Sequence, residues 1–270
     1  MNKKETQNTI QGFSSYLSNK GRKPSTIKRY IYDVESFIQW LHQSKKFSND
    51  NTWESLNKQD FKVFFDYLKE GRQRLKQVVS SLEGLTEKQS STRPMLLERN
   101  LSIIILLLDY GLSLQELVSL QMKYVHFESN TLSIPEESKI NRTIHLKEED
   151  KLHLYHYYKT IPEPVRPKYH SKDPFFIAFD FTRGTYRWSY DNDAPKFLTE
   201  ISVQKMIRLE IRRANLRKGI SAQHFRNTFV LRKIKQKSNS EQIMLQIGFK
   251  SHLSLKRYYD YYKKTKVTTD

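Results

Sequence analysis

The chain has 270 residues, enough for two ordinary domains, and 37% of them are hydrophobic, enough to build apolar cores. Its 47 lysines and arginines against 29 aspartates and glutamates leave a formal net charge of +18, an excess that a polyanion such as DNA, RNA or an acidic membrane surface would offset. The absence of cysteine excludes disulfides, cysteine-ligated zinc and thiol catalysis, and no apolar run approaches the roughly 20 residues of a membrane span. We therefore expect a cytoplasmic protein with no membrane partner.

The first 85 residues predict a small helical domain. One apolar stripe at helical spacing runs through residues 27–41, after Pro24 and Ser25, and Ser25 is placed to cap that helix. Apolar stripes in residues 10–17 and 61–68 predict a helix on either side of it. Two basic residues, Lys28 and Arg29, lie on the middle helix.

Residues 83–94 lose this periodicity and gather small polar side chains, which favours an interdomain linker over a buried loop. The second domain would then cover residues 95–270. It opens with an apolar helix to Leu108, and Ser113 with Glu116 three residues later forms a capping box for the next helix.

Two β-strands are predicted at residues 131–134 and 142–146, on either side of a turn over 138–141. Residues 147–159 return to a helical pattern. Residues 160–195 hold five of the eight prolines and no clean period, so we expect an irregular connection. Helical patterns resume at Ser202 and continue to the C-terminus. The predicted fold class is mainly α with a small β-hairpin.

A strongly basic stretch extends from Ser202 to Lys237. Glu210 is its one acid, against lysines and arginines at 205, 208, 212, 213, 217, 218, 226, 232, 233, 235 and 237. Lys205, Arg208 and Arg212 share one helix face, whereas Ile207 and Ile211 lie on another that can pack on a core. Such a helix can place cationic groups along phosphates while remaining docked, so we predict a nucleic-acid contact here. Charge alone leaves DNA and RNA open.

The order of motifs resembles the tyrosine recombinase, or phage integrase, family. Residues 23–30 followed by Asp33, Phe37 and Trp40-Leu41 are similar to the opening of that family's helical core-binding domain. Four blocks resemble its catalytic domain in the right order: residues 110–117, 138–146, 221–229 and 247–259. The resemblance covers nearly the whole chain. It implies a core-binding domain over 1–85, a catalytic-type domain over 95–270 and double-stranded DNA as partner, with no cofactor, metal or small-molecule substrate.

The family's chemistry needs particular residues at these positions. A tyrosine hydroxyl attacks a phosphodiester, while two arginines clamp the non-bridging oxygens as charge develops. A lysine on the hairpin turn protonates the leaving 5′-oxygen, and histidines assist proton transfer. The resemblance places Lys139, Arg226 and Tyr258 at the lysine, second-arginine and nucleophile positions. Because tyrosines also stand at 259, 261 and 262, the register of the nucleophile stays open by one residue.

Three positions depart from the family pattern. Ser113 stands where the first arginine belongs, Gln223 where a histidine belongs, and Phe249 where a histidine or tryptophan belongs. His224 is one residue out of register, which turns it about 100° away on a helix. A serine hydroxyl cannot replace the bidentate guanidinium, and by analogy with a lost oxyanion-hole donor the rate should fall at least about 10²-fold.

This pattern favours a sequence-specific DNA-binding protein that has lost recombinase activity, such as a transcriptional repressor or accessory factor of phage or mobile-element origin. The alternative is an active, divergent recombinase in which Lys123, Arg142 or Arg257 replaces the missing groups. An inactive partner of an active recombinase is a third possibility, and the short tail after Tyr262 suggests self-association on DNA. The predicted DNA contacts are Lys28, Arg29, Lys139, Lys205, Arg208, Arg212, Arg226 and Arg257.

Overall fold

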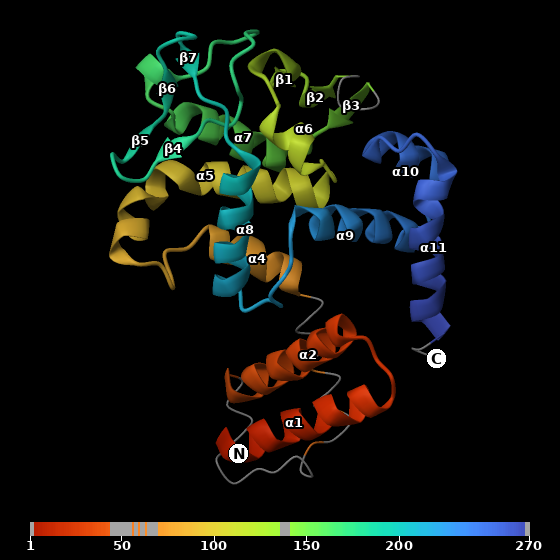
Figure 1. Ribbon diagram of the computed structural model, residues 1–270. Helices are drawn as coiled ribbons and strands as arrows, with labels where there is room; N and C mark the ends of the chain where they lie inside the picture. Colours follow the sequence, from red (N-terminus) through yellow and green to blue (C-terminus); the bar gives the residue numbers. More distant parts are fainter. Residues whose placement is uncertain are drawn as a thin grey trace. The chain divides into compact units, whose positions relative to one another are not determined.

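The chain folds into helices with small antiparallel sheets, as expected (Figure 1). The computed structural model describes residues 3–43, the single positions 56, 59 and 63, and residues 70–135 and 141–267. It divides into two compact units: unit 1 comprises Met1–Leu75 with Ile211–Gly219, and unit 2 comprises Lys76–Glu210 with Ile220–Asp270. Residues 76–85 and 211–219 thus group differently from the expected boundaries.

Unit 1 is built on α1 (Lys3–Asn19) and α2 (Pro24–Gln43), which contact each other. The helix α2 begins at Pro24, so Ser25 lies inside the helix and its expected capping role is wrong. Proline is favoured at a first helical position because the N–H that it lacks would have no partner there. Phe37, Trp40 and Leu41 form its buried cluster, against which Val63 packs. The helix expected over residues 61–68 otherwise lies outside the described residues.

The segment 211–219 joins unit 1 through α4 (Gly71–Val79). A Cβ at Gly71 would lie 2.9 Å from Leu216 Cδ2, so glycine allows Leu216 to approach the start of α4 closely. Arg74 Nε donates a hydrogen bond to the carbonyl oxygen of Ala214 at 3.1 Å. These contacts explain why a segment so late in the sequence packs with the N-terminal unit.

The centre of unit 2 is α5 (Glu87–Asp109), which packs on α7 (Glu148–Thr160) and α9 (Ala222–Lys235). Its start corrects the predicted linker. Thr86 and Gln89 form a reciprocal capping box, and the helix continues through Pro94. Arg93 Nη1 lies 2.6 Å from Glu210 Oε1, and both side chains are buried. This ion pair stabilises the first turns of α5, whose small polar residues have low helix propensity and were therefore predicted as a loop.

The predicted β-hairpin is confirmed within a three-stranded antiparallel sheet of β1 (Val125–His126), β2 (Thr131–Ile134) and β3 (Arg142–His145). Leu132 pairs with Ile144 and Ile134 with Arg142. The alternation buries these four residues together, including the charged Arg142. Lys139, which falls between β2 and β3 in the sequence, lies outside the described residues.

Residues 160–195 are more ordered than the expected irregular connection. They contain a 3₁₀ turn, η4 (Glu163–Val165), and two short ladders: β4 (Phe179–Asp180) with β5 (Thr185–Tyr186), and β6 (Trp188–Ser189) with β7 (Ala194–Pro195). Strands of two residues are too short to give a periodic signal. Phe175, Phe176 and Ile177 anchor this region in the core.

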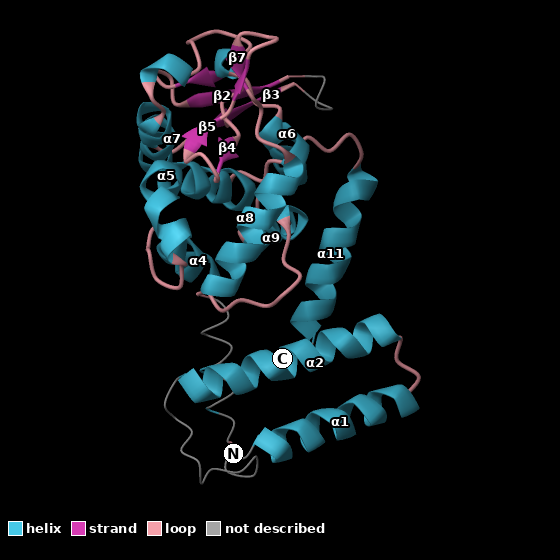
Figure 2. Cartoon of the chain, turned by 60° about the vertical axis from the view of Figure 1, so that its left-hand side comes forward, coloured by secondary structure: helices cyan, strands magenta, loops and turns pink. Residues whose placement is uncertain are grey.

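The remaining helices of unit 2 are α6 (Leu114–Val118), α8 (Glu200–Arg213), α10 (Ser240–Ile247) and α11 (His252–Val267), with a 3₁₀ turn, η2 (Met122–Tyr124), after α6. The helices α9, α10 and α11 share one apolar cluster that includes Ile247 and Tyr258. The short strands lie on one side of α5 and α9 lies on the other in both views (Figures 1 and 2). Among the described helices, none combines the length and the apolar character of a membrane span.

Candidate functional site

The site is built around Glu116 on α6. The predicted capping box is confirmed: Ser113 Oγ accepts a hydrogen bond from the Glu116 N–H at 3.2 Å, and Glu116 Oε2 accepts one from the Ser113 N–H at 2.7 Å. Ser113, which the resemblance places at the family's first-arginine position, is therefore occupied as the cap of a helix. The cap also turns the Glu116 carboxylate into the interior, where it is buried.

Two buried arginines from distant parts of the sequence converge on that carboxylate. Arg142 Nη1 on β3 lies 2.7 Å from Glu116 Oε1, and Arg226 Nη1 on α9 lies 3.3 Å from Glu116 Oε2. One negative charge thus faces two guanidinium groups. Burial acts to raise the pKa of Glu116, but the hydrogen bond and charge of Arg142, the Ser113 N–H and the charge of Arg226 together hold it below its usual value.

The other guanidinium donors are bound to main-chain carbonyls. Arg226 donates to the carbonyl oxygens of Gly111 and Ile247, and Arg142 Nε donates to that of Gln246 at 3.0 Å. These bonds connect the C-terminal end of α10 to β3 and to the turn before α6. Burial lowers the pKa of Arg226, which is 8% exposed, and the neighbouring Glu116 opposes that shift.

Tyr258, the candidate nucleophile on α11, is buried at 5% exposure. Its hydroxyl donates a hydrogen bond to Asn227 Oδ1 at 2.8 Å and accepts one from Arg257 Nη2 at 3.0 Å. Phe249 stacks on the tyrosine ring at 6.0 Å, and the Arg226 guanidinium lies 5.7 Å from the centre of the Phe249 ring. The structure therefore brings Arg226 and Tyr258 together around Phe249.

Gln223 and His224 on α9 also take part in internal hydrogen bonds. Gln223 Nε2 donates to Asn227 Oδ1 at 2.8 Å, so this amide oxygen accepts from both Gln223 and Tyr258. His224 lies near Ser221 instead, with Nδ1 at 2.9 Å from the serine Oγ, at the start of α9.

Sequence reasoning missed the shared carboxylate and the acceptor role of Asn227. The signal for the first was available: Arg142 falls on the inward face of a strand, and a charged side chain there requires a buried partner. Of the other candidate substitutes, Lys123 Nζ lies 4.6 Å from the centre of the Tyr124 ring, and Arg257 lies beside Tyr258.

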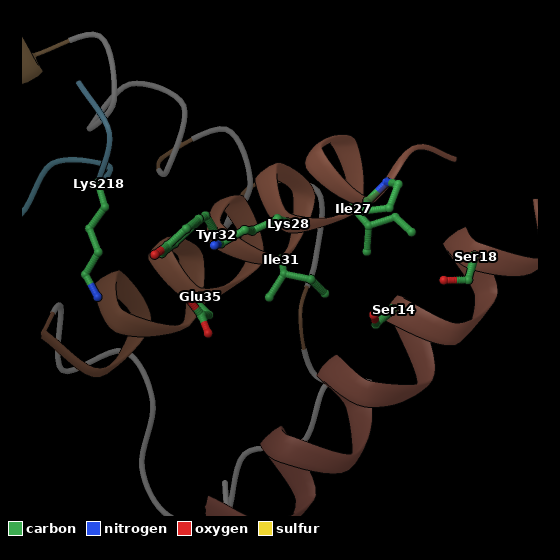
Figure 3. Close-up of a pocket in the computed structure, with 9 residues that line it drawn as sticks. Ser14, Ser18, Ile27, Lys28, Ile31, Tyr32, Glu35 and Lys218 are labelled. Carbon is green, nitrogen blue, oxygen red and sulfur yellow. The ribbon is translucent and has the colours of Figure 1, made fainter. Parts of the chain in front are cut away.

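The predicted DNA contacts fall on both units. Lys28 and Arg29 are exposed on α2, and Lys28 lines an open pocket of about 580 Å³ together with Lys218 (Figure 3). On α8, Lys205, Arg208 and Arg212 are exposed while Ile207 and Ile211 are buried, so the predicted division of that helix into two faces is confirmed. Arg257 is exposed on α11.

No family model matches the chain. It is 25% identical over 176 residues to the tyrosine recombinase XerD of Oceanobacillus iheyensis, a match that covers 64% of this chain and 55% of that protein, little more than half. The crystal structure of XerA recombinase matches with a TM-score of 0.53 at 15% identity, covering 96% of this chain and 97% of that one. XerH site-specific recombinase bound to palindromic difH substrate matches with a TM-score of 0.52 at 18% identity, covering 73% and 49%.

The fold is therefore that of the site-specific recombinases. Together with the sequence match, it supports the resemblance to the tyrosine recombinase/integrase family that the four ordered motifs predicted.

Proposed function

We propose that this chain binds specific double-stranded DNA sites without cleaving them and acts as a regulator, such as a transcriptional repressor of phage or mobile-element origin. One observation carries the proposal: the guanidinium of Arg226 is buried and bound to Glu116 and to two main-chain carbonyls. A clamp on a reacting phosphate needs donors aimed at the developing charge. Here those donors are committed to holding the fold together.

The residue best placed to replace the missing first arginine is committed in the same way. Arg142 is bound to Glu116 and to Gln246, and its side chain is 1% exposed. Releasing either arginine toward a phosphate would leave Glu116 short of a partner in the interior, which is costly. Ser113 supplies a neutral hydroxyl that already caps α6. Clamping of the phosphate by two arginines is therefore disfavoured.

The environment of Tyr258 also argues against attack on DNA. A tyrosine nucleophile must lose its proton to a base as it attacks. The group that accepts the Tyr258 hydrogen bond is the amide oxygen of Asn227, which has no useful basicity. The hydroxyl is thus placed for a stable internal hydrogen bond.

DNA binding is supported by the exposed cations. Lys205, Arg208 and Arg212 project from a helix whose other face is buried, and the chain carries a formal net charge of +18. Among the proteins of similar fold, XerH was crystallised bound to its difH substrate. Phosphate contacts of this kind provide affinity, and a few contacts to base edges would provide specificity.

The test is incubation of the protein with fragmented source-genome DNA, read both as footprints and as denaturant-resistant covalent adducts. We expect discrete footprints, no adducts, and unchanged affinity for Tyr258→Phe. Arg208→Ala should weaken binding and reduce the slope of log affinity against log salt by about 0.9. Adducts that disappear in Tyr258→Phe would overturn the proposal.

A divergent active recombinase is the second candidate, favoured by one observation. The Arg257 guanidinium donates to the Tyr258 hydroxyl, and a cation there would stabilise a phenolate or an adjacent phosphate. Under this alternative, Arg257→Ala would abolish adducts that the wild-type protein forms on a nicked substrate. Under the proposed function, neither protein forms them.

A further inference from the structure

A cavity of about 670 Å³ lies in unit 2, between α5, the β4–β5 ladder and α8. Its lining residues include none of Glu116, Arg142, Arg226 or Tyr258, so it is separate from the site described above. Its size falls within the range of small-molecule sites, roughly 300–1,000 Å³.

One buried guanidinium in its lining has no counter-charge among the residues that the structure describes. Of the buried arginines in the described part of the chain, Arg93 pairs with Glu210, whereas Arg142 and Arg226 share Glu116. Arg99, only 4% exposed, has hydrogen bonds to the Asn100 side chain and to the Ile177 carbonyl, all at 3.3 Å. It has no carboxylate partner within the described ranges.

These bonds are long and incomplete. Arginine carries five N–H donors, and 3.3 Å is beyond the usual hydrogen-bond range of about 2.7–3.2 Å. Nε and Nη2 share the Asn100 oxygen and Nη1 donates to Ile177, so each terminal nitrogen keeps one further N–H. Burial lowers the pKa of Arg99, because removing the charged guanidinium from water costs free energy. A bound anion would offset that cost.

The rest of the lining combines apolar walls with a basic rim. Leu96, Phe179 and Leu198 are buried walls, and Phe181, 53% exposed, stands with them in the lining. The other charged lining residues are Lys88, Arg93, Asp180, Arg187 and Lys205. Asp180 is the one acid among these lining residues; it lies 3.6 Å from Arg187 and accepts hydrogen bonds from the Thr182 and Arg183 N–H groups. The cations of the lining therefore outnumber the acid.

We propose that this cavity binds a small organic carboxylate, with the carboxylate on Arg99 and an apolar body against Leu96, Phe179 and Leu198. Arginine engages a carboxylate through two parallel hydrogen bonds, which the two terminal nitrogens can supply. A phosphate of duplex DNA is fixed on the outside of the double helix and cannot reach a guanidinium that is 4% exposed. The ligand is bound without reaction, and the inference does not depend on DNA binding.

The test uses the full chain without DNA and measures saturation-transfer NMR and calorimetric titration. The probes are phenylbutyrate and octanoate, each with its matched amide, and an acetylated Leu-Leu-Phe peptide with a free or amidated C-terminus. We expect at least one acid to bind about tenfold or more tightly than its amide. The peptide arm distinguishes a free acid from a peptide terminus as the source of the carboxylate.

Two variants locate the binding. Arg99→Met should abolish the preference for acid over amide, and Met206→Trp should block the cavity from the α8 side without touching the guanidinium. Arg208→Met, which removes an arginine of α8 outside the cavity lining, is the matched control and should bind as wild type. If Arg99→Met does not fold by circular dichroism, Met206→Trp decides. Equal binding of acids and amides, no binding of any probe, or undiminished binding in the folded cavity variants would overturn the inference.

Discussion

Replacement of Glu116 by glutamine tests whether one buried carboxylate holds the catalytic-type region together. The amide matches the carboxylate in size and can still accept the Ser113 N–H, so the variant removes a charge without creating a cavity. In the wild-type protein, Arg142 and Arg226 lie 2.7 Å and 3.3 Å from the two carboxylate oxygens of Glu116. The variant leaves both arginines without this counter-charge.

The expected loss in the free energy of unfolding follows from that geometry. Removing one partner of a buried ion pair costs about 3–5 kcal/mol, because the remaining charge stays desolvated. Here two cations lose the same partner, and Arg142 Nη2 is already buried without a hydrogen bond in the described structure. We expect a loss near the upper part of that range.

The assay is urea unfolding followed by hydrogen exchange in peptides from α6 and α9. A chain with two compact units need not unfold in one transition, so the signal must come from unit 2 itself. Glu98→Gln is the matched control: it makes the same chemical change at a half-buried carboxylate that pairs with His153, where about 1 kcal/mol or less is expected. If Glu116→Gln costs no more than the control, the two arginines do not depend on this charge and the reasoning is wrong.

The same variant has a pH signature. Because the pKa of Glu116 is held below its usual value, its charge stabilises the fold above the unfolded pKa of about 4.3, and that contribution is lost as pH falls through the lower folded pKa. The difference in stability between wild type and Glu116→Gln should therefore be full at neutral pH and shrink in acid. A difference that stays constant down to strongly acidic pH would contradict this account.

Three further predictions concern unit 2. The hydrogen bond that His153 donates to the Glu98 carboxylate raises the pKa of His153, so stability from this pair should be full below about pH 6.5 and fall as pH rises through the folded pKa. His153→Gln should remove that slope in thermal melts, and an unchanged slope would contradict this prediction. Arg99→Met should leave the free energy of unfolding unchanged or raise it by up to about 2 kcal/mol, since it removes a buried cation without a counter-charge; a large loss would mean that the cation stabilises the empty protein. Gly111→Ala should cost about 2 kcal/mol or more in urea unfolding, because its φ is +69° and the new Cβ would lie 2.7 Å from Phe229; a neutral result would mean that the turn relaxes easily.

Several features that depend on neighbouring residues were predicted correctly, although the cap expected at Ser25 was wrong and the capping box of Thr86 and Gln89 was missed. The capping box at Ser113 and the hairpin of residues 131–134 and 142–146 follow from spacings of three and two residues. The two faces of α8 follow from the helical period. The start of α5 was missed because its first turns carry small polar residues, and the salt bridge that buries Arg93 joins it to a residue 117 positions away. The two-residue strands of residues 179–195 are held by long-range packing and leave no local pattern.

The sequence by itself determined the family resemblance, the basic face of α8 and the presence of a serine where that resemblance expects an arginine, because each depends only on which residues stand at which spacing. The sequence does not determine whether Arg142 and Arg226 are available to a phosphate. Their availability depends on which acceptors meet their N–H groups, and Glu116 lies 26 residues before Arg142 and 110 residues before Arg226. Only the tertiary structure brings these groups within hydrogen-bonding distance in a buried region, and it thereby commits Arg226, which the resemblance places at the second-arginine position, to the interior of the protein.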